Sequence, residues 1–468
     1  MSAFEFTVSD LCGPHGFFST ERSVCISRAP GRLDLMGGNV DYTGGLVFQS
    51  TIREATWAAV QQRIDRRIVF WNPQMKHEGW LDRVEFSFGA LSSIEAVKAL
   101  VNASPEIRWT AYVLGAFFLL HERYPDQTQV GSSIYIESEV PLNKGVSSSA
   151  AIEVSVMKAA AASYGIDLRG IELAEACQWV ENVIADSACG IMDQAASVLG
   201  EEGHILPLLC QPCLPSPLVK LSAGLRCWAI DSGVCHAVTG IEYEAARAAA
   251  FIGYRMICDW ENLPIIQDDT GRIPRYSDPK WNGFLSNMAP SIFRSRYEQR
   301  LPEFISGAEV LAMQSTHPDP FTTVRPEVPY RARACARYAV EENQRIQLFI
   351  ELARCNVQHA SEAAFLQMGE LMFQSHWSYT ETGLGCEATD QLVEIVRDHC
   401  GEGRLYGAKV TGGGAGGTVA VLGAPDATDE FQQVVAEYTK LRSFEPYVFE
   451  GSSMGADRFG IHVLRESQ

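Results

Sequence analysis

The first half of the chain alternates between strand-like and helix-like hydrophobic patterns. Apolar residues that repeat every three or four positions predict helices over 108–124 and 171–186, and an Ala-rich stretch predicts another over about 147–165. A further helix is expected to begin near Gly190. Short runs of alternating or continuous apolar residues predict strands. These strands are residues 23–29, 45–52, 66–72, 83–88, 132–140, 204–210 and 225–233.

The second half of the chain begins with a different pattern. Residues 262–330 are rich in proline, and we interpret them as an irregular insertion or cap that contains short helices. A helix-rich stretch follows from Tyr330 to about His399, and the last segment returns to strands, with a glycine loop and one helix among them. This order predicts an α+β protein of two lobes. We place the lobes at residues 1–230 and 231–468.

Composition narrows the partners that the chain can have. Its 468 residues, 46% of them apolar and 20% charged, are enough for about two or three lobes. The formal net charge of −19 argues against nucleic acid or an anionic membrane as the main partner. We see neither a secretory signal nor an apolar run of membrane-spanning length. Thirteen scattered cysteines do not make a disulfide framework, so we expect a reducing, cytoplasmic location.

The segment "PLNKGVSSSAA" (141–151) carries the clearest chemistry. A predicted strand ends, a loop with Gly145 turns, and a helix begins among the three serines at 147–149. Such a junction gathers free backbone N–H groups and the positive end of a helix dipole, which suits phosphate oxygens. One serine would be enough to cap the helix. Three serines preceded by Lys144 favour a phosphate site, and the Walker pattern of P-loop proteins is absent.

Acidic residues follow in "WVENVIADSACGIMDQ" (179–194). Glu181 lies within a predicted helix, and Asp193 lies at the start of the next one. Phosphoryl transfer to an alcohol needs a carboxylate that holds or takes the hydroxyl proton, but an aspartate at a helix start is also an ordinary cap. Spacing alone leaves both interpretations open. The run "TGGGAGG" (411–417) is more typical of turns and close packing than of ligand contact.

Another glycine-rich stretch, "GRLDLMGGNVDYTGG" (31–45), has too many glycines for a buried strand and too many polar residues for a flexible linker. Together with Pro30, and followed in order by "PLNKGVSSSAA" and "KVTGGGAGG" (409–417), it resembles the three signature motifs of the GHMP small-molecule kinases. Other stretches resemble the galactokinase branch of that superfamily. These are "RWTAYVLGA" (108–116), "ACGIMDQ" (188–194), "DSGVCHAVTGIEYEAAR" (231–247) and "SHWSYTETGLGCEATDQL" (375–392).

The resemblance covers nearly the whole chain except 262–330. It implies a two-lobed GHMP kinase fold, with an N-terminal lobe like ribosomal protein S5 and a ferredoxin-like α/β C-terminal lobe. It also implies an ATP-dependent sugar 1-kinase that uses Mg²⁺. The partners would be a small sugar and ATP, with neither nucleic acid nor membrane, in a monomer or a weak homo-oligomer.

The resemblance also assigns roles to residues. Arg32 would orient the anomeric hydroxyl and stabilise the charge on the transferring group, and Asp193 would be the base or hold that hydroxyl. Ser149 and Glu181 would bind Mg²⁺, and the 411–417 loop would mainly support the other motifs. Trp109 would stack near the adenine. The phosphates would lie on Asn143, Lys144, Gly145, Val146, Ser147, Ser148 and Ser149, and the sugar on Gly38, Asn39, Asp41, Gly190 and Tyr243.

Two positions depart from the galactokinase pattern. Asn143 and Lys144 stand where the phosphate loop usually has more glycine, which leaves the local conformation open. Gly38 and Asn39 stand where galactokinases generally have Glu-His, the pair that reads the C6 side of galactose. L-Arabinopyranose has the ring hydroxyls of galactopyranose without the CH₂OH group, so losing this reader favours an L-arabinose 1-kinase. "FEGSS" (449–453) also resembles the kinase domain of L-arabinokinases.

Other functions remain open at this point. The substrate could be D-galactose, for which Gly38 leaves room. A C6-modified galactose such as galacturonate would gain from the loss of a carboxylate, but residues 36–45 offer no cation to pair with it. A sugar-sensing regulator without turnover is the alternative from another class. Such regulators tend to lose parts of the phosphate loop, whereas the serines, Glu181 and Asp193 all stand here.

Overall fold

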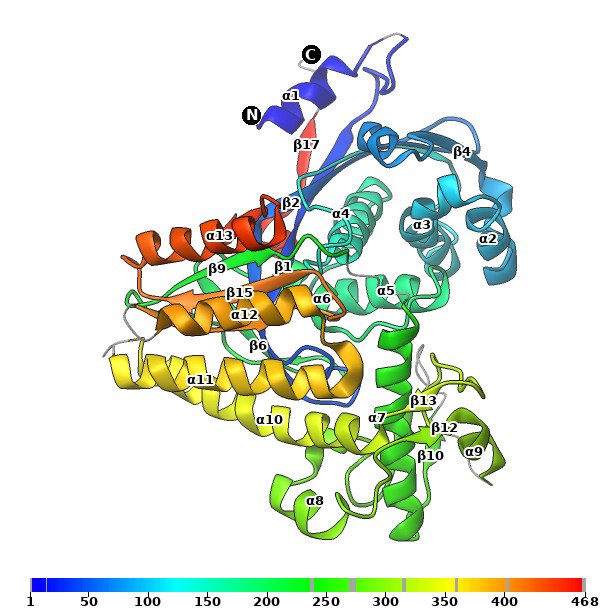
Figure 1. The fold of residues 1–468 in the computed structure, drawn as a ribbon. Helices are drawn as coiled ribbons and strands as arrows, with labels where there is room; N and C mark the ends of the chain where they lie inside the picture. Colours follow the sequence, from blue (N-terminus) through cyan, green and yellow to red (C-terminus); the bar gives the residue numbers. More distant parts are fainter. Residues whose placement is uncertain are drawn as a thin grey trace.

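Two large β-sheets, two small two-stranded sheets and the helices around them make up the described part of the molecule (Figure 1). This computed structural model describes residues 2–13, 15–235, 240–268, 275–313, 317–357, 361–400 and 404–464. Within these ranges, no helix combines the length and the apolar character that crossing a membrane requires. Sheets and helices mixed in this way confirm the α+β class predicted from the sequence.

The first sheet is built on two long strands, β1 (Val24–Met36) and β2 (Leu46–Gln62). They pair antiparallel, with two register shifts in the second half of β1, and such irregularities bend a strand. The sheet has the order β17-β1-β2-β5-β3-β4, and β6 pairs with the first part of β2 and with the short β7 and β8. Only the β3–β5 pair is parallel among the described strands. The other strands are β3 (Arg67–Trp71), β4 (Arg83–Ser87), β5 (Ser132–Ser138), β6 (His204–Leu209), β7 (Leu214–Pro215), β8 (Val219–Lys220) and β17 (His462–Leu464).

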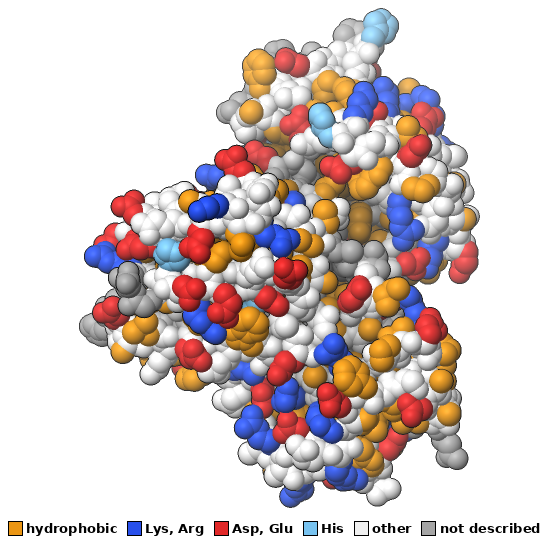
Figure 2. Space-filling model, in the orientation of Figure 1, with side chains coloured by type: hydrophobic (Ala, Val, Ile, Leu, Met, Phe, Trp, Pro, Cys, Tyr) orange, Lys and Arg blue, Asp and Glu red, His pale blue; other side chains and the backbone are white. Residues whose placement is uncertain are grey.

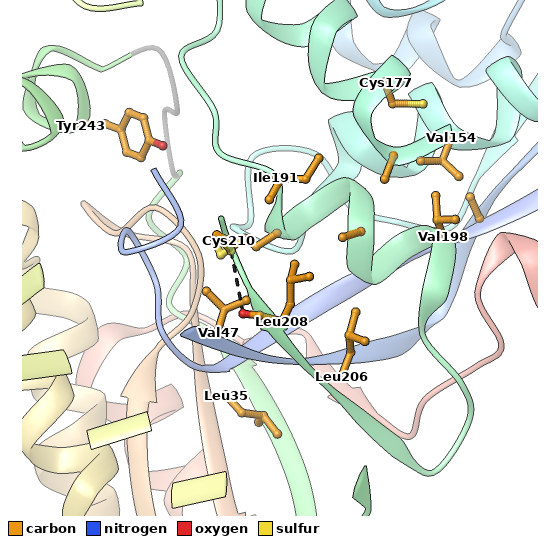
Figure 3. Close-up of a cluster of buried hydrophobic side chains, with 14 of the residues drawn as sticks. Leu35, Val47, Val154, Cys177, Ile191, Val198, Leu206, Leu208, Cys210 and Tyr243 are labelled. Carbon is orange, nitrogen blue, oxygen red and sulfur yellow. Dashed lines mark hydrogen bonds between the residues drawn. The ribbon is translucent and has the colours of Figure 1, made fainter. Parts of the chain in front are cut away.

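Helices α4 (Ser148–Ser163) and α6 (Met192–Leu199) pack on β1 and β2. Helices α3 (Ala111–Arg123) and α5 (Gly170–Val183) pack in turn against α4. Figure 3 shows the core between these layers, where side chains from α4, α5, α6 and β6 meet. The start of α6, which carries Asp193, therefore rests directly on the main hydrophobic core.

The second sheet contains four antiparallel strands in the order β14-β15-β9-β16. Helices α11 and α12 pack on β14, and α12 also contacts β15 and α13. Helix α10 lies between α7 and α11. The strands are β9 (Arg226–Asp231), β14 (Leu405–Val410), β15 (Thr418–Gly423) and β16 (Val448–Glu450). The helices are α7 (Ile241–Trp260), α10 (Ala332–Cys355), α11 (Glu362–Tyr379), α12 (Glu387–Cys400) and α13 (Thr428–Arg442), with a π-helical turn at Thr380–Leu384.

The chain passes between the two large sheets more than once. The boundary at residue 230 falls inside β9, all of which belongs to the second sheet. The end of the chain returns to the first sheet, because β17 pairs with β1. The described ends of the chain consequently lie near each other, with α1 (Ala3–Asp10) beside β17 (Figure 1). Hydrophobic periodicity identifies a strand but does not say which sheet it joins, so the division into lobes at residue 230 remains a prediction.

The segment 262–330, called the insertion below, packs on α7 and α10. It does contain short helices in irregular chain, as predicted, and its residues 269–274 and 314–316 lie outside the described ranges. Its own hydrophobic cluster joins Trp281 and Phe293 to Tyr254 of α7 and Ala339 of α10. Its elements are β10 (Ile266–Asp268), β11 (Arg275–Ser277), η4 (Leu285–Asn287), α8 (Pro290–Arg296), β12 (Ile305–Ser306), α9 (Gly307–Ala312) and β13 (Pro329–Tyr330). The remaining elements of the chain are η1 (Pro73–Glu78), η2 (Phe88–Ala90), α2 (Ile94–Val101), η3 (Pro105–Thr110) and α14 (Ala456–Phe459).

Candidate active site

A cavity of about 560 Å³ lies between the two lobes. The face drawn in Figure 2 is hollowed between the part that carries α2 and α3 and the part that carries α12 and α13, and hydrophobic side chains lie along the hollow. Most of the predicted site residues line this cavity, although they come from distant parts of the chain. They are Arg32, Asn39, Asp41, Trp109, Asn143, Gly145, Ser147, Ser148, Ser149, Glu181, Gly190, Asp193 and Tyr243.

An ion pair between Arg32 of β1 and Asp193 of α6 lies at the centre of the cavity wall. The Arg32 Nε and Nη2 atoms lie 2.8 and 2.7 Å from the same carboxylate oxygen, Oδ1. The other oxygen, Oδ2, accepts a hydrogen bond of 2.6 Å from the Ser147 hydroxyl. The Arg32 side chain is 3% exposed and that of Asp193 is 21% exposed. Asp193 thus faces the cavity with one oxygen fixed by a guanidinium and the other held only by a hydroxyl.

The predicted phosphate loop, residues 143–149, turns sharply before α4. Asn143, Gly145 and Ser147 all have positive φ values, of 58°, 71° and 62°. Asn143 therefore adopts the left-handed conformation that a glycine usually supplies at such a position. The loop is fixed at its Gly145 carbonyl by Arg32 Nη1, at 2.7 Å. The second lobe holds it too, because the Thr418 hydroxyl donates to the Lys144 carbonyl at 2.7 Å.

Helix α4 begins at the end of this loop without a side-chain cap. Ser147 occupies the N-cap position, but its hydroxyl is turned to Asp193 and makes no cap hydrogen bond. The first N–H groups of an α-helix have no partner within the helix, and the helix dipole makes that end positive. Ser148 and Ser149 line the cavity at this point. The N-terminus of α4 is therefore suited to hold phosphate oxygens.

A buried acidic cluster adjoins the phosphate loop. Burial, followed by the nearby charge of Asp193, raises the pKa of Glu181 to about 7, and the neighbouring Ser149 hydroxyl opposes this rise. The Gln194 amide donates to Glu181 at 2.6 Å and to Glu153 at 3.2 Å. Burial and then the proximity of Glu181 raise the pKa of Glu153 well above its ordinary value. A cation placed here would stabilise these carboxylates in their ionised form.

Glu153 and Gln194 are parts of the site that we did not predict. Glu153 follows Ser149 by four residues on α4, so helical spacing places both side chains on one face. That spacing was a usable signal. The sequence contained no such signal for Gln194, because its contact with Glu181 depends on how α5 and α6 pack.

Asp41, one of the predicted sugar-binding residues, is a buried carboxylate in the cavity wall. It accepts hydrogen bonds from the backbone N–H of Tyr42 at 2.9 Å and of Met192 at 3.4 Å. A Cβ at Gly190 would lie 1.8 Å from Asp41 Oδ2, so the carboxylate fits there only against a glycine. Burial, and then the charge of Asp193, raise the pKa of Asp41 to about 6. Tyr243, from α7, is buried in the same wall.

Gly38 and Asn39, which depart from the galactokinase pattern, hydrogen-bond to tyrosines of the second lobe. Asn39 lines the cavity with φ 60°, and its amide Nδ2 donates to the Tyr379 hydroxyl at 2.6 Å. The Gly38 carbonyl accepts a hydrogen bond of 2.8 Å from the Tyr338 hydroxyl. A Cβ at Gly38 would meet Asp34 Oδ2 at 2.8 Å and the Gly412 carbonyl oxygen at 3.0 Å. Gly38 therefore does not line the cavity, and no free space is reserved there for a side chain.

Two other predicted contacts differ in the structure. The Lys144 ammonium pairs with buried Asp231 of the second lobe at 2.7 Å, so its side chain is directed away from the cavity. Val146 is buried in a small core cluster with Leu33 and Ile52. Neither side chain can contact phosphate in this arrangement, although their backbone groups belong to the loop. In the glycine-rich stretch 31–45, the residues up to Met36 form the buried end of β1, and the residues after it form a loop.

Flat and apolar side chains line the other end of the cavity. Trp109 of η3 donates its indole N–H to the Leu81 carbonyl at 3.0 Å, which fixes the ring. Trp80, Tyr112 and Met75 lie in the same wall. A planar base would find apolar surfaces there, with the phosphate loop at one side of it. The stacking that we predicted between Trp109 and adenine remains a prediction.

Three family descriptions match the chain. "GHMP kinases N terminal domain" matches residues 111–201, "GHMP kinases C terminal" matches residues 360–440, and "Galactokinase galactose-binding signature" matches residues 16–62. The first segment contains the predicted phosphate loop and Asp193, the second contains α11, α12 and most of α13, and the third contains β1 and Asp41. The chain belongs to the GHMP kinase superfamily, in its galactokinase branch.

Curated relatives of this GHMP kinase include sugar kinases with two different substrates in their names. The L-arabinokinase of Arabidopsis thaliana is 33% identical over 98% of this chain, which spans about half of that relative, 48% of its length. The galactokinase of Chloroflexus aggregans is 29% identical over 87% of this chain and 85% of its own.

Solved structures show the same fold. Lactococcus lactis galactokinase, solved with galactose, matches at a TM-score of 0.71 and 20% identity, over 92% of this chain and 94% of its own. A mevalonate kinase matches at a TM-score of 0.53 and 14% identity, over 92% of this chain and 99% of its own. The fold is therefore the GHMP kinase fold that the resemblance implied.

Proposed function

We propose that this GHMP kinase transfers the γ-phosphoryl group of ATP to the anomeric hydroxyl of a galacto-configured sugar, with L-arabinose as the preferred substrate. The observation that carries the proposal is the meeting of Asp193, Arg32 and Ser147 at the N-terminus of α4. A proton acceptor and an anion-binding helix end there face one cavity. A sugar hydroxyl at Asp193 and phosphates at α4 would be neighbours.

Each of these residues has a defined task in the reaction. Oδ2 of Asp193 accepts the hydrogen bond of the sugar O1–H in place of the one from Ser147, and takes the proton as O1 attacks the γ-phosphorus. The O1–P bond forms while the bond to the β,γ-bridging oxygen breaks, and ADP leaves. Arg32 places a buried positive charge against the transferring group, which develops negative charge in the transition state. Asp41 holds the sugar in the attacking orientation.

The residues beside the phosphate loop fit a magnesium ion. Mg²⁺ prefers oxygen ligands and is usually held by one or two carboxylates together with substrate phosphates. The carboxylate of Glu181 and the hydroxyl of Ser149 supply such ligands, and one buried oxygen of Glu153 has no hydrogen-bond partner. When bound, the ion neutralises charge on the triphosphate. Glu181 and Ser149 would hold it, and Gln194 orients Glu181 through its amide.

The sugar end supports a substrate without a C6 hydroxymethyl group. Gly38 has no side chain to read such a group, and Asn39 is tied to Tyr379 through its amide nitrogen. A galactose CH₂OH would therefore be bound without the partners that a Glu-His pair provides, and it would only crowd the wall. The likeness to an L-arabinokinase over 98% of this chain supports the same choice. D-Galactose is the second candidate, favoured by the galactokinase relatives.

Steady-state kinetics with purified protein, Mg²⁺ and ATP tests this proposal. We expect kcat/KM for L-arabinose to exceed that for D-galactose by about tenfold to two-hundredfold, because crowding alone discriminates modestly. D-Galacturonate should react poorly, because residues 36–45 offer it no cation. A preference for galactose would refute the sugar assignment and leave the kinase assignment standing. Binding of sugar and ATP without turnover would instead favour a sugar-sensing regulator.

A further inference from the structure

The insertion contacts the loop that carries Asp41, at the residues that follow Asp41 in the chain. Gly44 has φ 79°, and a Cβ there would lie 2.2 Å from the Phe284 ring of the insertion. Ser286, two residues later, shares a hydrogen bond of 2.9 Å between its hydroxyl and that of Thr43, and its N–H donates to the Thr43 carbonyl at 3.3 Å. Asn343 of α10 ties the same place to β2, because it donates to the Ser286 carbonyl and accepts from the Leu46 N–H, each at 2.8 Å.

A second contact reaches the near end of the same loop. Arg247, one turn after Tyr243 on α7, makes two hydrogen bonds of 2.8 Å to Asp319 of the insertion, through Nε and Nη2. Its Nη1 donates to the Ala188 carbonyl at 3.0 Å. The guanidinium carbon lies 5.0 Å from the centre of the Tyr42 ring. Arg247 thus touches the residue after Asp41 and the segment that leads to Gly190.

The burial of this pair makes its geometry rigid. The side chain of Arg247 is 4% exposed and that of Asp319 is fully buried. Burial opposes ionisation of Asp319, but the Arg247 guanidinium holds the pKa of that carboxyl below its ordinary value. The Thr322 hydroxyl adds a hydrogen bond of 2.6 Å to Asp319. A bidentate arginine–carboxylate pair fixes direction as well as distance, so the insertion determines where Arg247 lies.

We propose that the insertion is a brace for the sugar-binding wall, and that Arg247, Asp319 and Ser286 are positioning residues for Asp41. The inference rests on the proposed function only in that it takes Asp41 to hold the sugar. The insertion contacts this loop at Thr43 and Gly44, and its partner Arg247 lies against the ring of Tyr42. Arg247 also bonds to the segment that leads to Gly190, the residue against which Asp41 lies. None of these three residues lines the cavity itself.

Variants of the brace should separate sugar binding from nucleotide binding. The double variant Arg247→Met with Asp319→Leu removes both charges together, so that no unpaired buried charge remains to prevent folding. We expect its KM for the sugar to rise about tenfold or more, since small displacements of a positioning group are costly, with KM for ATP unchanged. Ser286→Ala should raise the sugar KM in the same direction by a smaller factor. Because Ser286→Ala removes only one hydroxyl, it still tests the proposal if the double variant fails to fold.

Arg325→Met is the matched control. Arg325 pairs with Glu244 at 2.6 Å and so also connects the insertion to α7, but neither side chain contacts the Asp41 loop in any described hydrogen bond. The control should leave both KM values unchanged. The proposal is overturned if the folded brace variants keep the wild-type sugar KM, or if the sugar and ATP KM values rise together in the brace and control variants, as a loss of general packing would cause.

Hydrogen exchange separates a failed brace from a failed functional assignment. If the wild-type protein phosphorylates no sugar, the proposed function is wrong, and the brace is then judged on the backbone amides of residues 43–45 alone. These amides bond back to the Val40 and Asp41 carbonyls within the loop. They should exchange faster in the double variant and in Ser286→Ala than in the wild type or in Arg325→Met. Equal exchange rates would overturn the brace.

Discussion

Replacing Gly190 by alanine should disable the sugar end of the site while the nucleotide end stays intact. A Cβ at this position would lie 1.8 Å from Asp41 Oδ2 and 2.1 Å from its Cγ, whereas ordinary contacts begin near 3.4 Å. Asp41 or the segment before α6 must therefore give way by about 1.6 Å. Gly190 does not have a positive φ, so alanine at this position adds no backbone strain to the steric clash.

The size of the effect follows from that displacement. A positioning group misplaced by about 1 Å costs about a hundredfold in rate, which equals about 2.7 kcal/mol of transition-state stabilisation. We therefore expect kcat/KM for the sugar to fall about a hundredfold or more in Gly190→Ala, with KM for ATP unchanged. Asp41 would also lose its hydrogen bonds to the Tyr42 and Met192 N–H groups, so the melting temperature should fall.

Steady-state kinetics and thermal melting on three variants check this reasoning. Gly89→Ala is the control, because the nearest atom to a Cβ there is 3.7 Å away and its φ is not positive. It should behave as wild type. Adding Asp41→Ala to Gly190→Ala removes the clash and should restore the melting temperature without restoring activity. A Gly190→Ala protein with wild-type kcat/KM would refute the close fit between Asp41 and Gly190.

The other predictions concern individual carboxylates. Asp193→Asn should lower kcat by about 10²- to 10⁴-fold and leave ATP affinity unchanged in a binding titration; a retained kcat would leave Asp193 only a structural partner of Arg32 and Ser147. Glu181→Gln should lower activity and shift the Mg²⁺ titration to higher concentration, and identical curves would remove Glu181 from the metal site. Burial and then Asp193 raise the pKa of Asp41 to about 6, so the folded state binds this proton more tightly than the unfolded state does. The stability that this proton contributes is complete below pH 4 and is lost as the pH rises through 6. In urea unfolding, the free energy of unfolding of Asp41→Asn relative to that of wild type should therefore rise by about 3 kcal/mol between pH 4 and pH 7. A difference independent of pH would contradict the raised pKa.

Sequence reasoning found the parts of the site that depend on local chain geometry. The turn between β5 and α4 was predictable because a strand, a glycine and a run of serines before a helix permit few other structures. Asn143 shows the limit of this reasoning, since the chain takes a positive φ there with a residue that is not glycine. Gly31 shows another limit. The glycines of 31–45 argued against a buried strand, but Gly31 lies within β1, where a Cβ would stand 2.5 Å from the Val146 carbonyl oxygen. Its glycine marks a close approach of two backbones.

Apart from Glu153, which lies one turn after Ser149 on α4, the contacts that sequence reasoning missed join distant segments. Arg247 and Asp319 are 72 residues apart, and the partner of Lys144 lies at Asp231 in the other lobe. A lysine or arginine in a pattern reveals its charge but not which buried acid it will meet. Tyr338 and Tyr379, which hydrogen-bond to Gly38 and Asn39, lie in a stretch for which the sequence predicts helices and nothing more. Tertiary packing decides these contacts, and no local pattern encodes them.

The most direct test of the whole account is to identify the product. Purified protein should be incubated with Mg²⁺, ATP and L-arabinose labelled with ¹³C at C1, and followed by ³¹P and ¹³C nuclear magnetic resonance. The account predicts a new sugar phosphate whose phosphorus couples to C1, formed as ADP appears, and no such signal in Asp193→Asn. Phosphate attached to another carbon, or ADP and free phosphate without a sugar phosphate, would contradict an anomeric sugar kinase.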